Sequence, residues 1–248
     1  MSSSNVNSEF AEFGNRMYLI AIFTLISFIL GIANWFWNGA SGINVFVGLL
    51  IFIFFLLILS DIKKAGTMLN NRNLLEFRSK FITSYILTII GAIVMATGGV
   101  ALFAMILYGI SSTILFIAVL VLVIIGIIIL LVGAILKIQA WGNLETFFTL
   151  NMTLFPQNIA NNAKEGSHYC KIGAILDITI ILSFIGDLLR VIGYFKLATL
   201  KDLKEAPAQP AISQQPPTPK AGSKFCPSCG SPITQGGRYC PSCGAEIT

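Results

Sequence analysis

The chain has 248 residues, of which 55% are hydrophobic and 11% are charged, and its formal net charge is +5. A soluble domain carries roughly a quarter charged residues, so this composition excludes an ordinary soluble protein and indicates a membrane protein. The 16 lysines and arginines are scattered over loops and the tail. They favour a role in setting membrane orientation over a nucleic-acid surface.

Residues 1–16 form a polar N-terminal segment without an early basic cluster, and no small-x-small cleavage site follows the first apolar run. A cleaved signal peptide is therefore not expected.

Residues 17–200 are predicted to form an all-α transmembrane bundle of about five spans. Apolar runs of about twenty residues match a hydrocarbon layer about 30 Å thick, because a helix rises about 1.5 Å per residue. The predicted spans are residues 17–37, 43–60, 81–107, 112–136 and 172–195. Between the last two spans, the connection 137–171 is expected to contain an amphipathic helix in the interface.

Residues 201–223 are predicted to be a linker, since residues 206–223 contain five prolines and no aromatic residue. Such a segment favours extended polyproline conformations at about 3 Å per residue, so it reaches up to roughly 50 Å.

Residues 224–248 contain two near-identical knuckles with the spacing C-x2-C-x10-C-x2-C. Cys226, Cys229, Cys240 and Cys243 are the predicted ligands of one structural zinc ion. Four thiolates complete a tetrahedral site and leave no position for water or substrate. The segment is expected to form a small β-hairpin zinc ribbon, with two disulfides or an iron site as the alternatives.

The predicted fifth span carries Asp177, Asp187 and Arg190. Ionisable groups in hydrocarbon usually face a bundle interior, a cavity or a partner. One hypothesis places Asp177 in an ion or proton pathway. The favoured interpretation is structural: Asp187 and Arg190 pair at i, i+3, while Asp177 reaches headgroups or Lys171.

Glycines recur seven residues apart in the last three predicted spans, at Gly91 and Gly98, Gly126 and Gly133, and Gly186 and Gly193. Small residues on one helix face allow close packing in a membrane, so these spans are expected to form the heart of the bundle.

Evidence for an enzyme is lacking in the sequence, which contains no Walker, H-E-x-x-H, G-x-S-x-G or Rossmann motif. His168 and Cys170 are interpreted as interface residues, since neither has a matching partner set. An intramembrane enzyme would have only His168 and Asp177 to use.

The predicted orientation contains a conflict. The loop 61–80 holds five Lys and Arg residues, which places it and the N-terminus in the cytoplasm. Five spans would then put the zinc thiolates outside, where thiols tend to be oxidised. The conflict disappears if span five is re-entrant, if residues 140–160 enter the bilayer, or if the tail is external. Lys196, Lys201 and Lys204 favour a cytoplasmic ribbon.

Two segments, Asn71–Arg78 and Lys171–Lys196, resemble an uncharacterised, largely archaeal family of multi-pass membrane proteins with a domain of unknown function. The resemblance covers residues 15–200, fits the connection 137–171 least well, and implies no activity. The tail is similar to a zinc-ribbon module found at the ends of many prokaryotic proteins.

The leading hypothesis is a non-enzymatic adaptor in the cell membrane, whose zinc ribbon binds a protein partner. RNA is a weaker alternative, because Lys220, Lys224 and Arg238 give the ribbon little positive charge. The bilayer is the other expected partner, and the formation of a homo-oligomer is an alternative that the sequence does not decide. The alternative function is a small transporter or channel with the charges of span five in its pathway.

Overall fold

The computed structural model describes residues 3–36, 41–109, 112–179 and 182–204. The chain divides into two compact units, residues 1–206 and residues 207–248. The predicted linker from residue 205 onward and the whole predicted ribbon lie outside the described residues, so the account below concerns the first unit.

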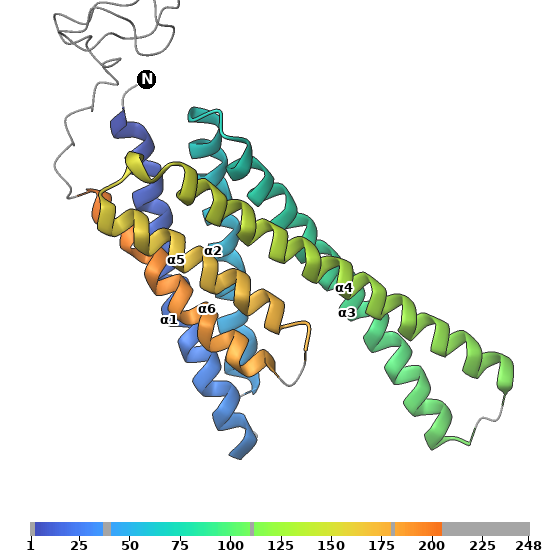
Figure 1. Cartoon of the computed structure of the whole chain (residues 1–248). Helices are drawn as coiled ribbons and strands as arrows, with labels where there is room; N and C mark the ends of the chain where they lie inside the picture. Colours follow the sequence, from blue (N-terminus) through green and yellow to red (C-terminus); the bar gives the residue numbers. More distant parts are fainter. Residues whose placement is uncertain (1–2, 37–40, 110–111, 180–181, 205–248) are drawn as a thin grey trace, which may run out of the picture. The chain divides into compact units, whose positions relative to one another are not determined.

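The first unit consists of helices that pair in chain order as antiparallel hairpins (Figure 1). The helices are α1 (Ser3–Phe36), α2 (Ser41–Met68), α3 (Arg72–Leu107), α4 (Thr113–Leu150), α5 (Gln157–Leu176) and α6 (Ser183–Ala198). Two short 3-10 helices, η2 (Met152–Leu154) and η4 (Thr199–Lys204), follow α4 and α6. The prediction of a helical membrane protein agrees with this architecture.

Among the described residues, four helices are long and apolar enough to cross a membrane, and they lie at Val6–Asn34, Phe46–Met68, Arg72–Leu107 and Thr113–Leu150. The prediction of a fifth span at residues 172–195 is wrong. Helix α5 ends at Leu176, where the N–H of Thr179 donates to the Leu176 carbonyl, and α6 begins at Ser183. The average hydropathy of the segment concealed this break, because apolar residues continue on both sides of it.

The predicted polar N-terminal segment is the first part of α1 and packs into an aromatic core. The ring of Phe10 stacks on Phe147 at 5.5 Å between centroids and meets Phe155 edge-on at 5.0 Å. The predicted connection 137–171 supplies these partners, as the end of α4, the helix η2 and most of α5. The core therefore joins segments that are far apart in the sequence.

Charged residues gather at the end of the unit where this aromatic core lies. Residues 17–60 and 81–136 contain no Asp, Glu, Lys or Arg. We call residues 3–16, 61–80, 138–171 and 196–204 the charged end. Ion pairs join its parts: Lys204 with Glu12 at 2.5 Å, and Lys196 with Glu165 at 2.6 Å.

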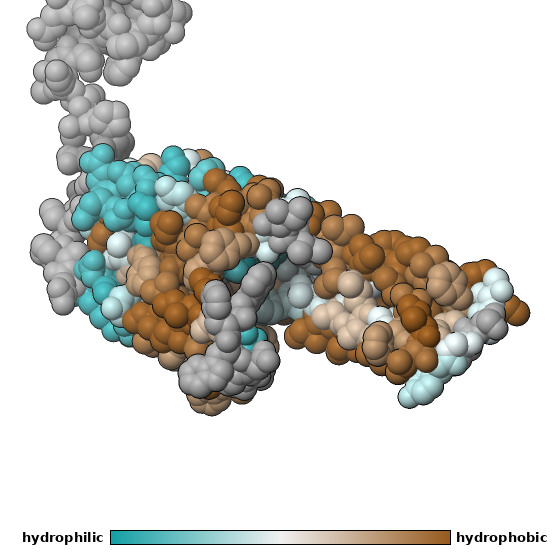
Figure 2. Space-filling view, turned by 90° about the horizontal axis from the view of Figure 1, so that it is seen from below, coloured by the Kyte–Doolittle hydropathy of each residue, from teal (hydrophilic) through white to brown (hydrophobic). Residues whose placement is uncertain are grey.

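Helices α3 and α4 form an arm that diverges from α1 and α2 (Figure 1). Hydrophobic residues cover this arm in Figure 2, and side chains such as Ile106 and Ile114 are 74% and 83% exposed. The uncharged residues 81–107 rise about 40 Å along the helix axis, whereas residues 17–36 of α1 rise about 30 Å. The arm therefore fits a layer about 30 Å thick only when it is tilted, which agrees with its divergence.

Candidate functional site: a charged cluster beside the hairpin turn

The charged residues predicted in span five meet at the interface of α4, α5 and α6. The Arg190 guanidinium lies 2.9 Å from Asp177 through Nη1 and pairs with Asp187 through Nη2. On α4, Lys137 donates to the same Asp177 carboxylate at 3.2 Å. The i, i+3 pair thus has the partners that its spacing predicts, and Lys137 is a fourth member that the sequence analysis missed.

The expected contact of Asp177 with Lys171 is not the one observed. Lys171 instead donates to Glu145 at 3.1 Å, while His168 shares that carboxylate at 2.8 Å through Nδ1. Lys171, His168 and Glu145 all belong to the charged end. Asp177 pairs with Lys137 of α4 in addition to Arg190 of α6, because the turn of the hairpin brings it beside both cations.

The four side chains of the cluster carry two positive and two negative formal charges, which cancel. Their exposed fractions are 22% for Lys137, 22% for Asp177, 17% for Arg190 and 43% for Asp187. The cluster is thus paired but not sealed from its surroundings. A neutral, paired arrangement is what a low-dielectric environment requires of charged groups.

Two ring contacts show where the cluster lies along α1. Phe184, at the start of α6, lies 4.8 Å from Phe28, whereas Phe195 near its end lies 6.1 Å from Tyr18. Helix α6 therefore runs antiparallel to the uncharged part of α1. Arg190 and Asp187 fall between these two contacts, beside a stretch of α1 that has the composition of a membrane span.

Glycines hold the two helices of the hairpin together. A Cβ atom at Gly166 would lie 2.7 Å from the carbonyl oxygen of Gly193, and one at Gly173 would lie 2.8 Å from that of Gly186. The sequence analysis singled out Gly186 and Gly193 but missed their partners. The heptad interval between Gly166 and Gly173 was the available signal, but it crossed the boundary between the predicted connection 137–171 and the predicted fifth span.

Cys170 lies buried in the same helix interface, next to Gly193. Burial raises the pKa of its thiol well above the ordinary range for cysteine. The residue is therefore part of the packing and is not a nucleophile in this setting. Across residues 3–204, apart from the gaps noted above, no three His, Cys, Asp or Glu side chains are grouped to hold a metal ion.

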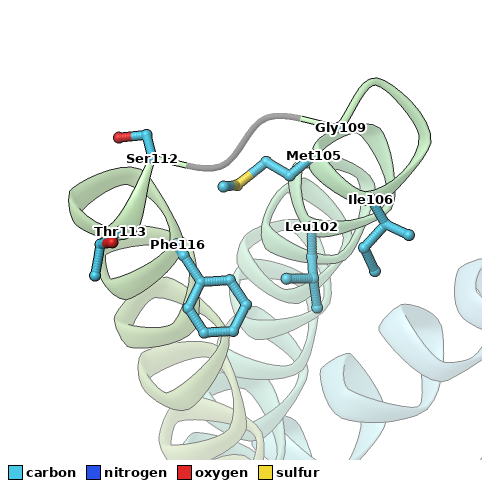
Figure 3. A pocket seen from close by; sticks show the side chains of 7 residues that line it. All are labelled: Leu102, Met105, Ile106, Gly109, Ser112, Thr113 and Phe116. Atoms are coloured by element: carbon cyan, nitrogen blue, oxygen red, sulfur yellow. The ribbon is translucent and has the colours of Figure 1, made fainter.

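An open hollow of about 440 Å³ lies elsewhere, beside the turn between α3 and α4 (Figure 3). It is lined by Leu102, Met105, Ile106, Gly109, Ser112, Thr113 and Phe116. None of these side chains is charged, and none belongs to the cluster. The hollow therefore offers an apolar surface with two hydroxyl groups and no group suited to acid-base chemistry.

Comparison with known proteins identifies a module in the second unit. A family model described as a zinc-ribbon domain matches residues 225–247. The match encloses Cys226, Cys229, Cys240 and Cys243, which lie outside the described residues. A four-thiolate donor set fits a tetrahedral zinc ion, and the family implies structural zinc binding.

No curated protein and no solved structure matched the chain. The resemblance of residues 15–200 to an archaeal membrane family therefore stays a prediction.

Proposed function

We propose that the protein is a non-enzymatic membrane adaptor, in which a four-span helical unit holds a zinc ribbon that binds a protein partner. The zinc-ribbon match at residues 225–247 is the observation that carries this proposal. Cys226, Cys229, Cys240 and Cys243 would supply all ligands of one ion. Because a four-cysteine site has no open position, the ion stabilises a recognition surface and performs no chemistry.

We further propose that the ribbon lies in the cytoplasm and that the helical unit spans the cell membrane. The concentration of Lys and Arg at the charged end supports this, since cytoplasmic loops carry the excess of positive charge. Four crossings return the chain to the side of its N-terminus. The conflict that five spans created between the basic loop 61–80 and the thiolates is thereby removed.

A transporter is the weaker alternative. Asp177, Asp187 and Arg190 neutralise one another with Lys137, and the hollow beside the α3–α4 turn contains none of them. A protein partner is also favoured over RNA, because Lys220, Lys224 and Arg238 are few cations for a nucleic-acid surface.

The proposal is tested by affinity purification of the full-length protein from native membranes, with the bound proteins identified by mass spectrometry. Cys229→Ser combined with Cys243→Ser should abolish zinc retention and the specific partner together, because the ribbon requires the metal to fold. Cys170→Ser is the matched control, since it changes a cysteine outside the motif and should retain both.

Deletion of residues 206–248 should leave the helical unit inserted in the membrane while the partner is lost. Recovery of the same proteins with the ribbon deleted or unfolded would refute the adaptor function. The zinc content, measured on the same samples, separates failure of the metal site from failure of recognition.

A further inference from the structure

We infer that α5 and α6 form a re-entrant hairpin, which enters the membrane from the charged end, turns inside the apolar layer and returns to the same side. The inference includes an aqueous path from the charged end to the cluster of Lys137, Asp177, Asp187 and Arg190. It does not depend on the adaptor function.

The lengths and directions of the two helices exclude a crossing. Helix α6 has 16 residues and rises about 24 Å, which is shorter than a hydrocarbon layer of about 30 Å. The glycine contacts show that α5 runs antiparallel to it. At the other end of the hairpin, Ile159 of α5 and Leu197 of α6 are both buried in the core that Phe10 joins.

The depth of the turn follows from its neighbours on α1. Phe184 contacts Phe28, which lies about 17 Å along α1 from Met17 at a rise of about 1.5 Å per residue. The uncharged stretch of α1 begins at Met17, directly after the Arg16 that pairs with Asp61 at 2.7 Å. The start of α6 therefore lies near the middle of the layer.

The charged residues then lie inside the apolar layer, between its middle and the surface at the charged end, where an exposed charge is costly. Insertion of a charged residue at the bilayer centre costs about 2.5–3.5 kcal/mol or more. The Asp187 side chain is 43% exposed and the other three are 17–22% exposed, so protein does not cover them fully. Contact of these surfaces with water, and not with lipid tails, removes this cost.

The backbone at the turn leads to the same conclusion. N–H groups of the turn donate to the carbonyls of Gly173, Ile175 and Leu176 at the end of α5, and irregular backbone of this kind at membrane depth is tolerated only inside protein or beside water. Lys137 and Arg190 place positive charge at this C-terminal end of α5, which complements its dipole. The cluster thus stabilises a helix end inside the layer.

The test uses thiol labelling of the full-length protein in sealed vesicles of both orientations, with a reagent that does not cross membranes. The background carries Cys170→Ala and serine at the four tail cysteines. Asp187→Cys probes the cluster, and Leu188→Cys, which is 38% exposed, leaves all ion pairs intact. Lys63→Cys marks the charged end, and Ile114→Cys marks the opposite end.

Ile29→Cys is the depth-matched control, because Ile29 is 56% exposed and follows Phe28 on α1. We expect Asp187→Cys to react from the side of Lys63→Cys only, and at least ten times faster than Ile29→Cys. Leu188→Cys should show the same sidedness whenever it reacts.

Labelling of either α6 cysteine from the side of Ile114→Cys would show that α6 crosses, and would overturn the inference. Reaction of Asp187→Cys as slow as that of Ile29→Cys would overturn the aqueous path. Neither outcome depends on whether the ribbon binds a partner, so failure here is distinguishable from failure of the adaptor function.

Discussion

The hairpins α3–α4 and α5–α6 are both packed through glycines seven residues apart, yet the two helices lie closer together in α5–α6 than in α3–α4. Cβ atoms at the four glycines of α5–α6 would lie 2.7–2.9 Å from backbone atoms across the interface. The corresponding distances to backbone atoms in α3–α4 are 3.0–3.5 Å. Glycine faces glycine in α5–α6, whereas Gly91 and Gly98 face Leu130 and Val123.

Close glycine packing therefore does not decide whether a hairpin crosses a membrane. The arm α3–α4 is long, and residues 81–136 carry no charge. The hairpin α5–α6 is short, has charged residues beside its turn and contacts both α1 and α4. Length and charge distinguish the two hairpins, and each can be changed separately from the glycine contacts.

The largest expected effect comes from the charges that only α5–α6 possesses. Arg190→Met leaves Asp177 and Asp187 without their shared cation, and we expect it to lower the free energy of unfolding by about 3 kcal/mol, the low end for a buried pair, because the cluster is partly exposed. Denaturant unfolding in detergent micelles measures this change. Adding Asp187→Asn should recover much of the loss, because Asp177 keeps its ion pair with Lys137 and no unpaired charge remains. Equal stability of Arg190→Met and wild type would contradict the role assigned to the cluster.

The glycine contacts predict a graded series of smaller effects. Gly166→Ala meets backbone on α6 at 2.7 Å, and we expect a loss of about 2–3 kcal/mol. Gly126→Ala meets Met95 N at 3.0 Å and should cost about 1–2 kcal/mol. Gly99→Ala, which meets nothing within 4 Å, should be neutral or stabilising by up to about 1 kcal/mol. Thermal unfolding ranks the three variants, and a reversed order of Gly166→Ala and Gly126→Ala would refute the comparison.

The smallest effect is expected where α5 and α6 leave the layer. The hydrogen bond from Lys196, with its positive charge, lowers the pKa of the exposed Glu165 carboxyl. Because the folded-state pKa is the lower one, the pair stabilises the fold above the unfolded-state pKa. This contribution is lost as the pH falls through the folded-state value.

Unfolding temperatures of wild type and Glu165→Gln should therefore differ slightly at neutral pH and converge in acid. A difference that grows in acid would contradict the sign of this pKa shift. Measurements of both proteins in the same detergent provide the comparison.

Much of the helical unit could be predicted from sequence because membrane thickness imposes its own length on a span. The length of the uncharged runs in α1 to α4 predicts four spans. The spacing of Cys226 to Cys243 predicts the zinc ribbon that the family match supports. Residues 172–195 misled the same reasoning, since one apolar helix and two short ones have similar average hydropathy. Gly166 was overlooked because it lies in the more polar connection 137–171, and Gly173 was therefore not recognised as half of a heptad pair.

By itself, the sequence determined the first four apolar spans and a zinc-ribbon module, because hydrophobic length and cysteine spacing are local properties, and it also suggested a fifth span that is wrong. Only the tertiary structure decided that α5 and α6 turn back on each other and that Asp177 pairs with Lys137, forty residues away on α4. Glycine contacts across the hairpin and an ion pair between distant helices depend on how the chain packs. That packing converts an apparent fifth span into a hairpin with a paired, partly exposed cluster.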